Sequence, residues 1–444
     1  MNKMILDQIK EAGIVGAGGA GFPTHAKLNC EPEYILANCA ECEPLIKSDK
    51  HLMERHAAEI VAGMETVVSC TGAAHGVIAL KSKNTEAVRA LEAAAAGTRV
   101  QIHQLENYYP AGDEQQIIYE VTGRRVPVGD IPIKAGCVVM NGQTLFQVAQ
   151  AVKGIPVTSR MVTVTGAVAE PFTTEVPIGT AVSYLLDLAG GPTIDDYVIV
   201  LGGPLMGRVV QSADGEFVTK TTNGVIVLPK DNVLIKLKTD DLEHQLKIAR
   251  SACCQCNYCT MICPRNALGL HVQPHKIMQA LTIGNGELLG DGSIALGCCN
   301  CGLCTYVGCN MGLTPSRFIS EVRAKLLAQK VKNRLEMGKV DLFRDEIKVD
   351  SHRVIGRMNL TAYDVEVPFV EKICRPRAVR ILLKQHIGAP CEPAVSEGSF
   401  VTKGQVVGQV PEKALGAPVH ASISGRVVSA TKDHIDILEE QEAR

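Results

Sequence analysis

Residues 253–264 read CCQCNYCTMICP, so that four cysteines follow the spacing C-x2-C-x2-C-x3-C and a proline comes directly after the last one. The same order returns in residues 298–309, CCNCGLCTYVGC, with one extra residue before the final cysteine. These two stretches hold ten of the seventeen cysteines in the chain. In a reducing compartment, cysteines gathered in this way are expected to be metal ligands rather than disulfides.

This spacing, with its proline, is the one by which bacterial ferredoxins bind two [4Fe-4S] clusters. Three thiolates two residues apart on a tight loop can bind three corners of one cubane, while the fourth cysteine reaches the neighbouring cluster. The two motifs are therefore expected to exchange their last ligand. One cluster is assigned to Cys253, Cys256, Cys259 and Cys309, and the other to Cys263, Cys298, Cys301 and Cys304.

Some features of the motifs depart from the ferredoxin pattern. Cys309 follows a longer spacer and lacks the proline, and Cys254 and Cys299 stand beside ligands that they could replace by a shift of register. Zinc sites also use C-x2-C pairs, but a third cysteine at the same spacing and a Cys-Pro step favour clusters. The remaining cysteines are expected to be small buried hydrophobic residues: Cys30, Cys39, Cys42, Cys70, Cys137, Cys374 and Cys391.

The overall composition excludes several classes of partner. The chain has 444 residues, which predicts several cores, and a formal net charge of -2, which offers no attraction to nucleic acid or to an anionic membrane. Aromatic residues are only 4% and tryptophan is absent, which disfavours a surface that stacks on bases. No apolar run approaches the ~18–20 residues of a membrane span, and the first ten residues lack the apolar core of a signal peptide. We expect a cytoplasmic protein without membrane insertion.

The chain divides into four expected modules. Residues 1–155 contain three buried apolar runs, 34–38, 77–81 and 100–105, and a helical run at 85–96, which predict an α/β layer. Residues 156–240 contain short strands between Gly/Pro turns and predict a small β-rich module. Residues 241–335 hold the cysteines, and a charged helical connector is expected at residues 315–337. Residues 336–444 contain a linker and valine-rich runs punctuated by glycine turns, as in a small β sandwich.

A glycine-rich loop stands near the start of the chain, where residues 16–27 read GAGGAGFPTHAK. It contains G-x-G-x-x-G, but the dinucleotide fingerprint should follow a strand, whereas residues 5–12 look helical and the first clear strand comes later. Backbone without side chains still allows a planar cofactor or a phosphate to approach amide N–H groups. A flexible surface turn is the alternative.

Several segments, in the right order, resemble the FMN-binding, NADH-oxidising subunit of respiratory complex I. The glycine loop resembles its flavin loop, residues 38–44 (NCAECEP) its acidic segment, residues 109–115 (YPAGDEQ) its Gly-Glu turn, and residues 139–145 (VMNGQTL) its asparagine-threonine segment. Over the whole chain, the order of modules resembles the cobalamin reductases of propanediol-utilisation microcompartments, with the C subunit of the Rnf complex as a near relative. Residues 202–207 (GGPLMG) and 385–390 (QHIGAP) extend this resemblance.

The resemblance implies an α/β multidomain fold. Residues 1–155 would form a complex I-type flavin-binding domain that also meets NADH, and residues 156–240 an SLBB-like β-grasp domain. A ferredoxin-like domain with two [4Fe-4S] clusters would follow at 241–335. Residues 336–444 would form a linker and a barrel-sandwich-like domain. The last domain also resembles biotinyl carriers, but the surroundings of Lys413 do not fit a modified lysine, so a docking or structural module is expected.

The resemblance also implies binding residues. FMN would be surrounded by Gly16, Gly18, Gly19, Lys27, Asn38, Glu41, Gly112, Glu114, Asn141 and Thr144, and the nicotinamide nucleotide would face Phe22 and Glu43. Phe22 can stack on a ring, and Lys27 can meet a phosphate or stabilise anionic reduced flavin. Glu41 and Glu43 could instead form a solvated turn. Asn141-Gly142 replaces the family's usual Asn-Asn, and Cys39 and Cys42 intrude into the acidic segment.

The function implied is transfer of electrons from NADH through FMN and two [4Fe-4S] clusters to a corrinoid, cob(III)alamin or cob(II)alamin, which reactivates a B12-dependent diol dehydratase. A flavin is needed because nicotinamide gives two electrons and a cluster takes one. Expected partners are NADH, a corrinoid or a corrinoid-adenosylating enzyme, and microcompartment shell proteins if the enzyme is encapsulated. Two alternatives remain: an Rnf-like, NADH-dependent donor to ferredoxin or another reductase, and a non-enzymatic two-cluster relay or docking protein without flavin.

Overall fold

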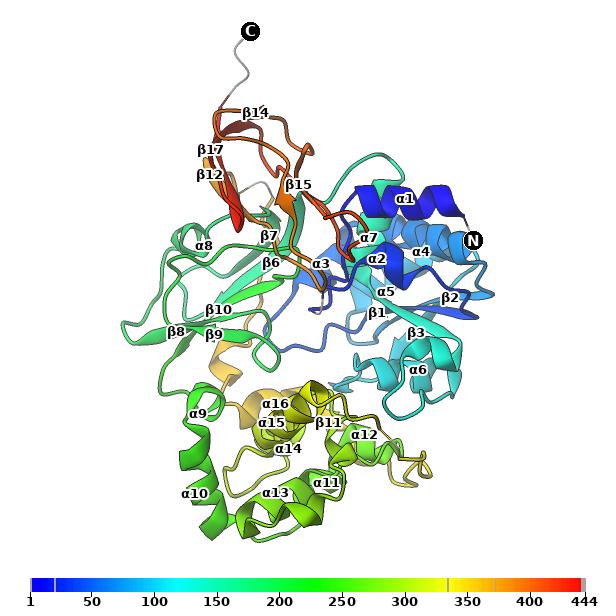
Figure 1. Cartoon of the computed structure of the whole chain (residues 1–444), viewed down its shortest axis with the longest axis vertical. Coiled ribbons are helices and arrows are strands. Elements are labelled where there is room, and N and C mark those ends of the chain that lie inside the picture. The colour runs from blue at the N-terminus through cyan, green and yellow to red at the C-terminus, as the bar shows by residue number, and fades with distance from the viewer. Residues whose placement is uncertain (1, 20, 334, 372, 441–444) are drawn as a thin grey trace.

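The N-terminal module is a parallel sheet covered by helices on both faces (Figure 1). In the computed structural model, which describes residues 2–440 except 20, 334 and 372, its strands lie in the order β3-β2-β1-β5. They are β1 (Tyr34–Cys39), β2 (His75–Lys81), β3 (Val100–Leu105) and β5 (Cys137–Asn141). The three strands expected from the apolar runs are therefore present. Ala20, within the glycine loop, lies outside the described residues.

The two faces of this sheet have different covers. One face packs against α1 (Lys3–Glu11), α4 (Ala57–Thr71), α5 (Thr85–Ala95) and α7 (Gly142–Ala151), and the other against α6 (Glu114–Thr122). Strands β1 and β2 are buried nearly continuously, as expected for a parallel sheet between helical layers. The glycine loop lies between α1 and the short α2 (Thr24–Lys27), ahead of β1, so the expected order of helix, loop and strand is confirmed.

The second module, called the β-grasp module below, has a five-stranded mixed sheet in the order β7-β6-β10-β8-β9. Its strands are β6 (Ser159–Gly166), β7 (Phe172–Pro177), β8 (Tyr197–Leu201), β9 (Arg208–Val210) and β10 (Gly224–Pro229). Within this sheet only β6 and β10 pair in parallel. Helix α8 (Val182–Leu188) covers one face, and α9 (Val233–Thr239) packs on the other.

The cysteine module lies below the first two modules in Figure 1 and is helical. It contains α10 (Leu242–Ala252), α11 (Tyr258–Met261), α12 (Pro264–Ala267), α13 (Pro274–Ile283), α14 (Leu303–Tyr306) and α15 (Pro315–Ala328). The prediction of a helical connector that extends to residue 337 is wrong, because α15 ends at Ala328. The N–H of Val331 donates to Leu326 O and that of Lys330 to Leu327 O, which closes the helix in a Schellman motif with Lys330 at φ +55°.

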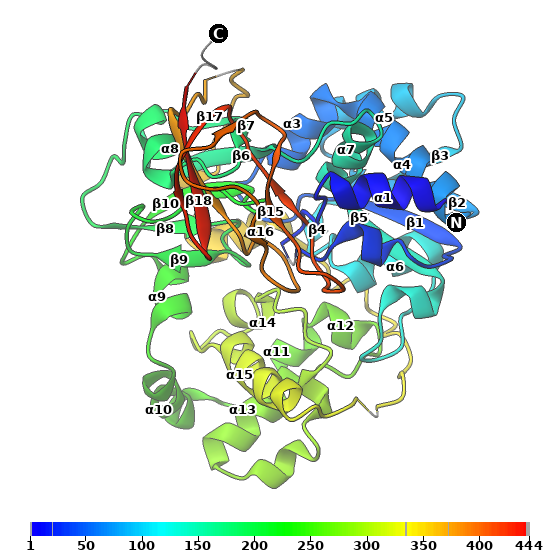
Figure 2. The same cartoon turned by 45° about the horizontal axis from the view of Figure 1, so that its top comes forward.

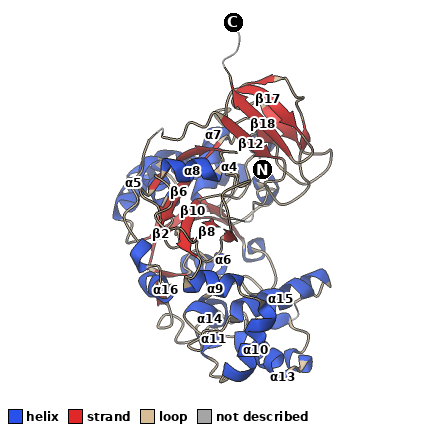
Figure 3. Ribbon diagram, turned by 90° about the vertical axis from the view of Figure 1, so that its left-hand side faces the viewer, coloured by secondary structure: helices blue, strands red, loops and turns tan. Residues whose placement is uncertain are grey.

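The C-terminal module is a small β sandwich, drawn in red at the top of Figure 3. One sheet has the order β12-β18-β17-β14 and the other β13-β15-β16. Their strands are β12 (Ala378–Leu382), β13 (Glu392–Pro393), β14 (Phe400–Val401), β15 (Val406–Gln409), β16 (Val419–His420), β17 (Gly425–Ala430) and β18 (His434–Glu439). Before it, β11 (Val349–Asp350) pairs with β4 (Tyr108–Tyr109), and α16 (Ser351–Arg357) follows.

The modules are joined by shared apolar cores. One core combines Ile46 of the N-terminal module, Val200 and Ile226 of the β-grasp sheet, and Leu303 and Tyr306 of the cysteine module. Figure 2 shows the modules from a second direction, with the C-terminal strands β17 and β18 beside the β-grasp sheet. No helix in the described part of the chain is long and apolar enough to cross a membrane.

Close packing of α4 on α7 gives a test of the fold. A Cβ added at Gly63 would lie 2.0 Å from the carbonyl oxygen of Leu145. Gly63→Ala should therefore destabilise the N-terminal module by about 1–3 kcal/mol through overpacking, seen as a lower midpoint of thermal unfolding. Gly286→Ala is the control, because a Cβ there meets no atom within 4 Å. Equal midpoints for the two variants would contradict the close approach of the helices.

Candidate functional site

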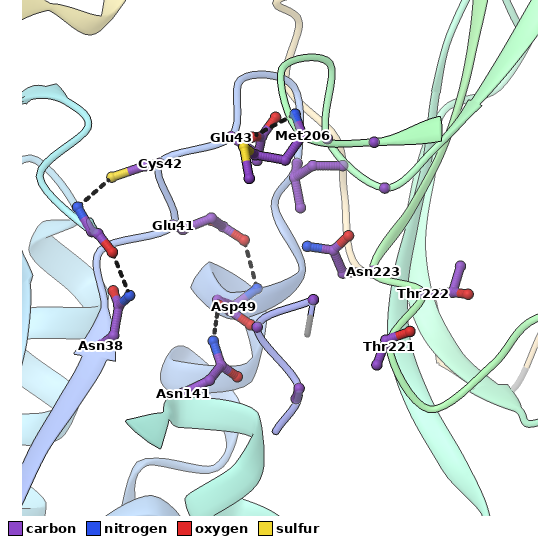
Figure 4. Close-up of a pocket in the computed structure, with 18 of the residues that line it drawn as sticks. Asn38, Glu41, Cys42, Glu43, Asp49, Asn141, Met206, Thr221, Thr222 and Asn223 are labelled. Carbon is purple, nitrogen blue, oxygen red and sulfur yellow. Dashed lines mark hydrogen bonds between the residues drawn. The ribbon is translucent and has the colours of Figure 1, made fainter. Parts of the chain in front are cut away.

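A cavity of about 800 Å³ opens between the N-terminal and β-grasp modules, with the cysteine module at its edge (Figure 4). The N-terminal module contributes eight of the twelve residues expected to bind FMN or nucleotide: Gly18, Gly19, Asn38, Glu41, Glu43, Gly112, Glu114 and Asn141. The β-grasp module faces them with Arg160, Arg208, Phe217 and residues 219 and 221–223. Cys299 and Cys301 also line the cavity.

The glycine loop presents bare backbone to this cavity. Its ends are closed by the N–H of Gly16, which donates to Phe22 O at 2.9 Å, and by the N–H of Gly21, which donates to Gly16 O at 3.2 Å. Gly19 has φ +114°, and a Cβ added there would meet nothing within 4 Å. The loop is thus not a loose surface turn. It leaves an open space over Gly18 and Gly19 that side chains would fill.

Glu41 holds the start of helix α3 (Ser48–Arg55). Its carboxylate accepts the N–H groups of Asp49 at 2.5 Å and Lys50 at 3.2 Å, as Figure 4 shows for Asp49. The Asp49 carboxylate in turn accepts the Asn141 side-chain amide at 3.0 Å. Burial and the neighbouring Asp49 raise the pKa of Glu41 to about 8, and burial also raises the pKa of Asp49.

Asn38 and Cys42 fix the Gly-Glu turn. The Asn38 side-chain amide donates to Gly112 O at 2.7 Å, and the Gly112 N–H donates to the Cys42 sulfur at 2.9 Å. A Cβ on Gly112 would lie 3.0 Å from the Asn38 side-chain oxygen and 3.2 Å from the Cys42 sulfur, so a larger residue would be crowded here. Burial raises the pKa of the Cys42 thiol. Cys42 is therefore a protonated thiol that orders the turn.

Glu43 joins two modules rather than forming a solvated turn. Its carboxylate accepts the backbone N–H groups of Leu205 at 2.8 Å and Met206 at 3.1 Å in the β-grasp loop. Burial raises the pKa of Glu43 to about 7. Gly203 packs directly on this side chain, since a Cβ there would lie 2.1 Å from a carboxylate oxygen.

The other four expected binding residues do not line the cavity. The Thr144 hydroxyl accepts the Ala17 N–H at 3.0 Å and so holds the glycine loop from behind. Lys27 lies 3.8 Å from Glu114, and Phe22 is half-buried beside Gly16, whose N–H its carbonyl accepts. Gly16 stands at the base of the loop. These four residues thus lie behind or beside the residues that line the cavity.

The wall opposite the glycine loop was not predicted from the sequence. Thr221, Thr222 and Asn223 stand on the β-grasp side of Figure 4, across from Glu41 and Asn141. Local motifs do not mark these residues, because they reach the cavity only through the packing of one module on another.

Arg160 of β6 belongs to the same wall and was also missed. Its guanidinium is buried and donates to Ala17 O at 2.9 Å, in the glycine loop. Its Nε has no partner in the described structure. A buried donor without a partner at a cavity wall is a feature that a bound ligand can satisfy.

Cysteines of the two motifs lie near one another. Burial and the nearby Cys309, Cys256 and Cys253 raise the pKa of Cys259 to about 12. Burial, together with Cys298, Cys263, Cys259 and Cys299, raises the pKa of Cys304, and a hydrogen bond with Cys299, burial and the nearby Cys263 raise that of Cys301. Cys309 thus lies near cysteines of the first motif and Cys263 near cysteines of the second, while Cys259 also lies near Cys304. Cys254 is exposed, whereas Cys299 is partly buried beside Cys301.

Backbone amides point at the sulfur of two of these cysteines. The Asn300 N–H donates to the Cys298 sulfur at 3.3 Å, and the Leu313 N–H to the Cys309 sulfur at 3.4 Å. Such hydrogen bonds to thiolates are a means by which proteins tune iron–sulfur clusters. Among the described residues, no three His, Cys, Asp or Glu side chains stand close enough to hold a single metal ion.

Two contacts bring Cys301 and the chain near Cys263 to the cavity. The Tyr109 hydroxyl, at the cavity wall, donates to Cys301 O at 2.8 Å. Arg265, two residues after Cys263, donates to the Asp113 carboxylate at 2.6 and 3.0 Å. Both partners in the N-terminal module belong to the segment that carries the Gly-Glu turn. A group bound in the cavity would therefore lie beside residues 109–113, which contact the chain at Cys301 and near Cys263.

Family models match all four modules. Residues 9–150 match the Nuo51 FMN-binding domain, 161–209 the SLBB domain, 252–314 a 4Fe-4S dicluster domain, and 366–442 the RnfC barrel sandwich hybrid domain. These matches confirm the expected fold class and support FMN and iron–sulfur clusters as cofactors.

Curated relatives are similar over nearly the whole chain. The chain is 41% identical to cobalamin reductase PduS of Salmonella typhimurium over 98% of its own length and 96% of the relative's. It is 39% identical to cobalamin reductase PduS of Citrobacter freundii over the same shares. The C subunit of the Na⁺-translocating ferredoxin:NAD⁺ oxidoreductase complex of Acetobacterium woodii is 35% identical over 63% of this chain and 60% of the relative.

The raised pKa of Glu41 predicts a pH dependence of stability. The folded-state pKa of about 8 lies above the ordinary value of 4.5, so the unfolded chain releases this proton first as the pH rises. The stability that Glu41 contributes is complete below pH 4.5 and is lost as the pH rises to 8. In Glu41→Gln this loss should disappear, so that the midpoint of thermal unfolding falls by a few degrees less between pH 5 and pH 8 than in the wild type.

The measurement is thermal unfolding at the two pH values, without added cofactor, and the exposed Glu31→Gln in the same module is the control. The same fall in Glu41→Gln and in the wild type would show that Glu41 is ionised in the folded protein.

Proposed function

The chain belongs to the family of PduS cobalamin reductases, and on this premise we propose that it oxidises NADH and passes the electrons to a corrinoid. The chain is an oxidoreductase with FMN-binding and 4Fe-4S dicluster domains. One observation carries the proposal: a single cavity is lined by the bare glycine loop and by Cys301 of a cysteine quartet. A flavin site and a cluster site would therefore share a wall.

The cavity fits FMN on two features of the described residues. Gly18 and Gly19 leave open space above backbone, and the buried Arg160 keeps an unpartnered Nε–H at the cavity wall. The proposed FMN residues are Gly16, Gly18, Gly19, Lys27, Asn38, Glu41, Gly112, Glu114, Asn141 and Thr144. When bound, the flavin supplies the conversion of two-electron hydride chemistry into single-electron transfer.

Within this set the chain's residues have different tasks. Gly18 and Gly19 admit the cofactor, Asn38 fixes the Gly-Glu turn, and Thr144 fixes the loop through Ala17. Phe22 and Glu43 are the proposed contacts of the nicotinamide nucleotide. Because two β-grasp amides already bind the Glu43 carboxylate, its proposed part is to shape the wall between the modules as well as to face the nucleotide.

The two cysteine motifs are the proposed ligands of two cubanes, with one ligand exchanged between them. We propose Cys253, Cys256, Cys259 and Cys309 for one cluster, and Cys263, Cys298, Cys301 and Cys304 for the other. The quartet containing Cys301 lies at the cavity, whereas Cys256 of the other quartet is exposed. The chain thus offers one quartet to the cofactor site and one to the surface, where an acceptor can approach.

The finer identity of the acceptor rests on the relatives. A corrinoid fits the printed activity of the two PduS proteins. We propose that its reduction serves the reactivation of a B12-dependent diol dehydratase, with a corrinoid-adenosylating enzyme as partner. We also propose that the protein works in the cytoplasm, inside a microcompartment, with shell proteins as partners.

The proposed domains are residues 1–155, 156–240, 241–335 and 336–444.

A second candidate is NADH-dependent donation to ferredoxin or another reductase. It is supported by the 35% identity to the C subunit of a ferredoxin:NAD⁺ oxidoreductase complex. That relative matches 63% of this chain, whereas the PduS proteins match 98%, so the corrinoid is the preferred acceptor.

The decisive experiment is an anaerobic titration of the reconstituted protein with NADH. Flavin bleaching is followed by absorbance and cluster reduction by EPR, and cob(III)alamin, cob(II)alamin or oxidised ferredoxin is then added. We expect bleaching, two cluster signals and turnover with the corrinoid. Turnover with ferredoxin alone would favour the second candidate. Clusters without flavin, unchanged by NADH, would show a two-cluster relay that another partner reduces.

Ligand variants test the crossed assignment. Cys309→Ala removes one proposed ligand, so one cluster should be lost and the iron content should fall to about half that of the wild type. Cys254→Ala is the matched control in the first motif, because Cys254 stands between the proposed ligands Cys253 and Cys256 without being one itself. This variant should retain its iron.

Iron and sulfide analysis together with EPR of the reduced protein measures the outcome, and Cys299→Ala is the corresponding control in the second motif. If Cys254→Ala halved the iron, the register of the first motif would be shifted by one residue. If Cys309→Ala kept its iron, Cys309 would not be a ligand.

A further inference from the structure

Two lysines, Lys81 and Lys220, have fully buried side chains among the described residues. Lys220 lies between β9 and β10 of the β-grasp module, beside the residues that form the wall of the cavity, but it does not line the cavity. Its Nζ donates to Gly13 O and to Pro418 O, both at 2.6 Å. A single side chain therefore connects the β-grasp module, the segment that enters the glycine loop, and the C-terminal module.

These two hydrogen bonds do not depend on the charge of Lys220. Burial lowers the pKa of Lys220 to about 7. The neutral amine still carries two N–H donors, so both carbonyl oxygens keep their partner in either protonation state.

Arg160 adds a second connection to the same loop. This buried guanidinium donates to the carbonyl of Lys220 and, at 2.9 Å, to the carbonyl of Ala17. The Ala17 N–H is in turn held by Thr144. Two buried basic side chains of the β-grasp module thus hold the entry to the glycine loop at Gly13 and the loop itself at Ala17.

The C-terminal module holds the loop at Gly21. The Ile387 N–H donates to Gly21 O at 3.1 Å, and the Gln385 side-chain oxygen accepts the Lys220 backbone N–H at 2.9 Å. Gly21 has φ +66°, and a Cβ added there would lie 3.2 Å from the Cα of His386 and 3.3 Å from Thr221. The loop is therefore enclosed between residues 385–387 and the β-grasp wall.

These contacts hold the chain on both sides of Gly18 and Gly19. Gly13, Ala17 and Gly21 are fixed from outside their own module, whereas a Cβ at Gly19 would meet no atom within 4 Å. The conformation that opens the loop toward the cavity thus depends on Lys220, which stands 207 residues after Gly13, and on residues still further along the chain.

We propose that Lys220 is a positioning residue for flavin binding. By joining the glycine-loop segment to the C-terminal module, it holds the loop open toward the cavity. This inference rests on the proposed function, because it takes FMN as the ligand of the cavity. The C-terminal module would then help to position the flavin-binding loop, a role that its β-sandwich fold does not by itself indicate.

The test compares Lys220→Met with Lys81→Met. Methionine keeps much of the buried volume but donates no hydrogen bond. Lys81 is similarly buried, and its Nζ donates to the Ser351 hydroxyl at 3.0 Å, away from the segment that enters the glycine loop. Both variants should lower the midpoint of thermal unfolding. Only Lys220→Met should weaken FMN binding, by about tenfold, since the two hydrogen bonds that join Gly13, ahead of the loop, to Pro418 of the C-terminal module are lost.

FMN affinity is measured by fluorescence titration of the full-length protein, and visible circular dichroism of the bound flavin reports its surroundings. A change in this spectrum for Lys220→Met, with an unchanged spectrum for Lys81→Met, supports the positioning role. Wild-type affinity and spectrum in Lys220→Met would overturn it, even if the variant is less stable.

A second variant covers the case in which Lys220→Met does not fold. Gln385→Leu removes the acceptor of the Lys220 backbone N–H from the C-terminal side and should also weaken FMN binding. Unchanged binding in this variant would overturn the inference. If the wild-type protein binds no FMN while its clusters assemble, the proposed function fails as well, whereas equal binding by wild type and variants contradicts the positioning role alone.

Discussion

The arrangement of the site depends on the ion pair between Arg265 and Asp113. Arg265 comes directly after the Cys263-Pro264 step, and Asp113 stands between Gly112 and Glu114 in the Gly-Glu turn. The pair is bidentate, and the exposed fractions of the two side chains are only 16% and 6%. Removing one partner of such a pair leaves a buried charge, which generally costs about 3–5 kcal/mol. This one ion pair therefore fixes the position of the first cysteine motif relative to the Gly-Glu turn.

Polar contacts also join the other modules around the cavity. Glu43 accepts two amides of the β-grasp loop, and Arg160 donates to the glycine loop from the opposite wall. These groups are largely removed from solvent, so each must find a partner across the boundary between modules. The unpartnered Nε of Arg160 is an exception at the cavity. Buried polar groups at the boundaries between modules are thus hydrogen-bonded, and the Arg160 Nε–H is left to donate to a ligand.

Local patterns explain how much of this could be predicted from the sequence. The cysteine spacing predicted a two-cluster domain, and the match of residues 252–314 to a 4Fe-4S dicluster domain agrees with it. Apolar runs predicted three of the four parallel strands. Arg160, Asp49 and Lys220 could not be predicted, because their roles depend on packing between distant segments. The length of α15 was also wrong, since its end is set by hydrogen bonds of the Lys330 turn rather than by composition.

The C-terminal module shows why the order of modules along the chain does not limit where they act. Its strands share one apolar core with the N-terminal sheet: Ile381 and Val419 belong to the same cluster as Ile35 and Met140. The Ser422 hydroxyl donates to Ile178 O, and the Arg380 N–H donates to Gly179 O at 2.9 Å, so the module is also bound to the β-grasp module. A module fixed on two sides can hold a loop in place. A freely tethered carrier domain could not impose the backbone conformation that Gly21 adopts beside residues 385–387.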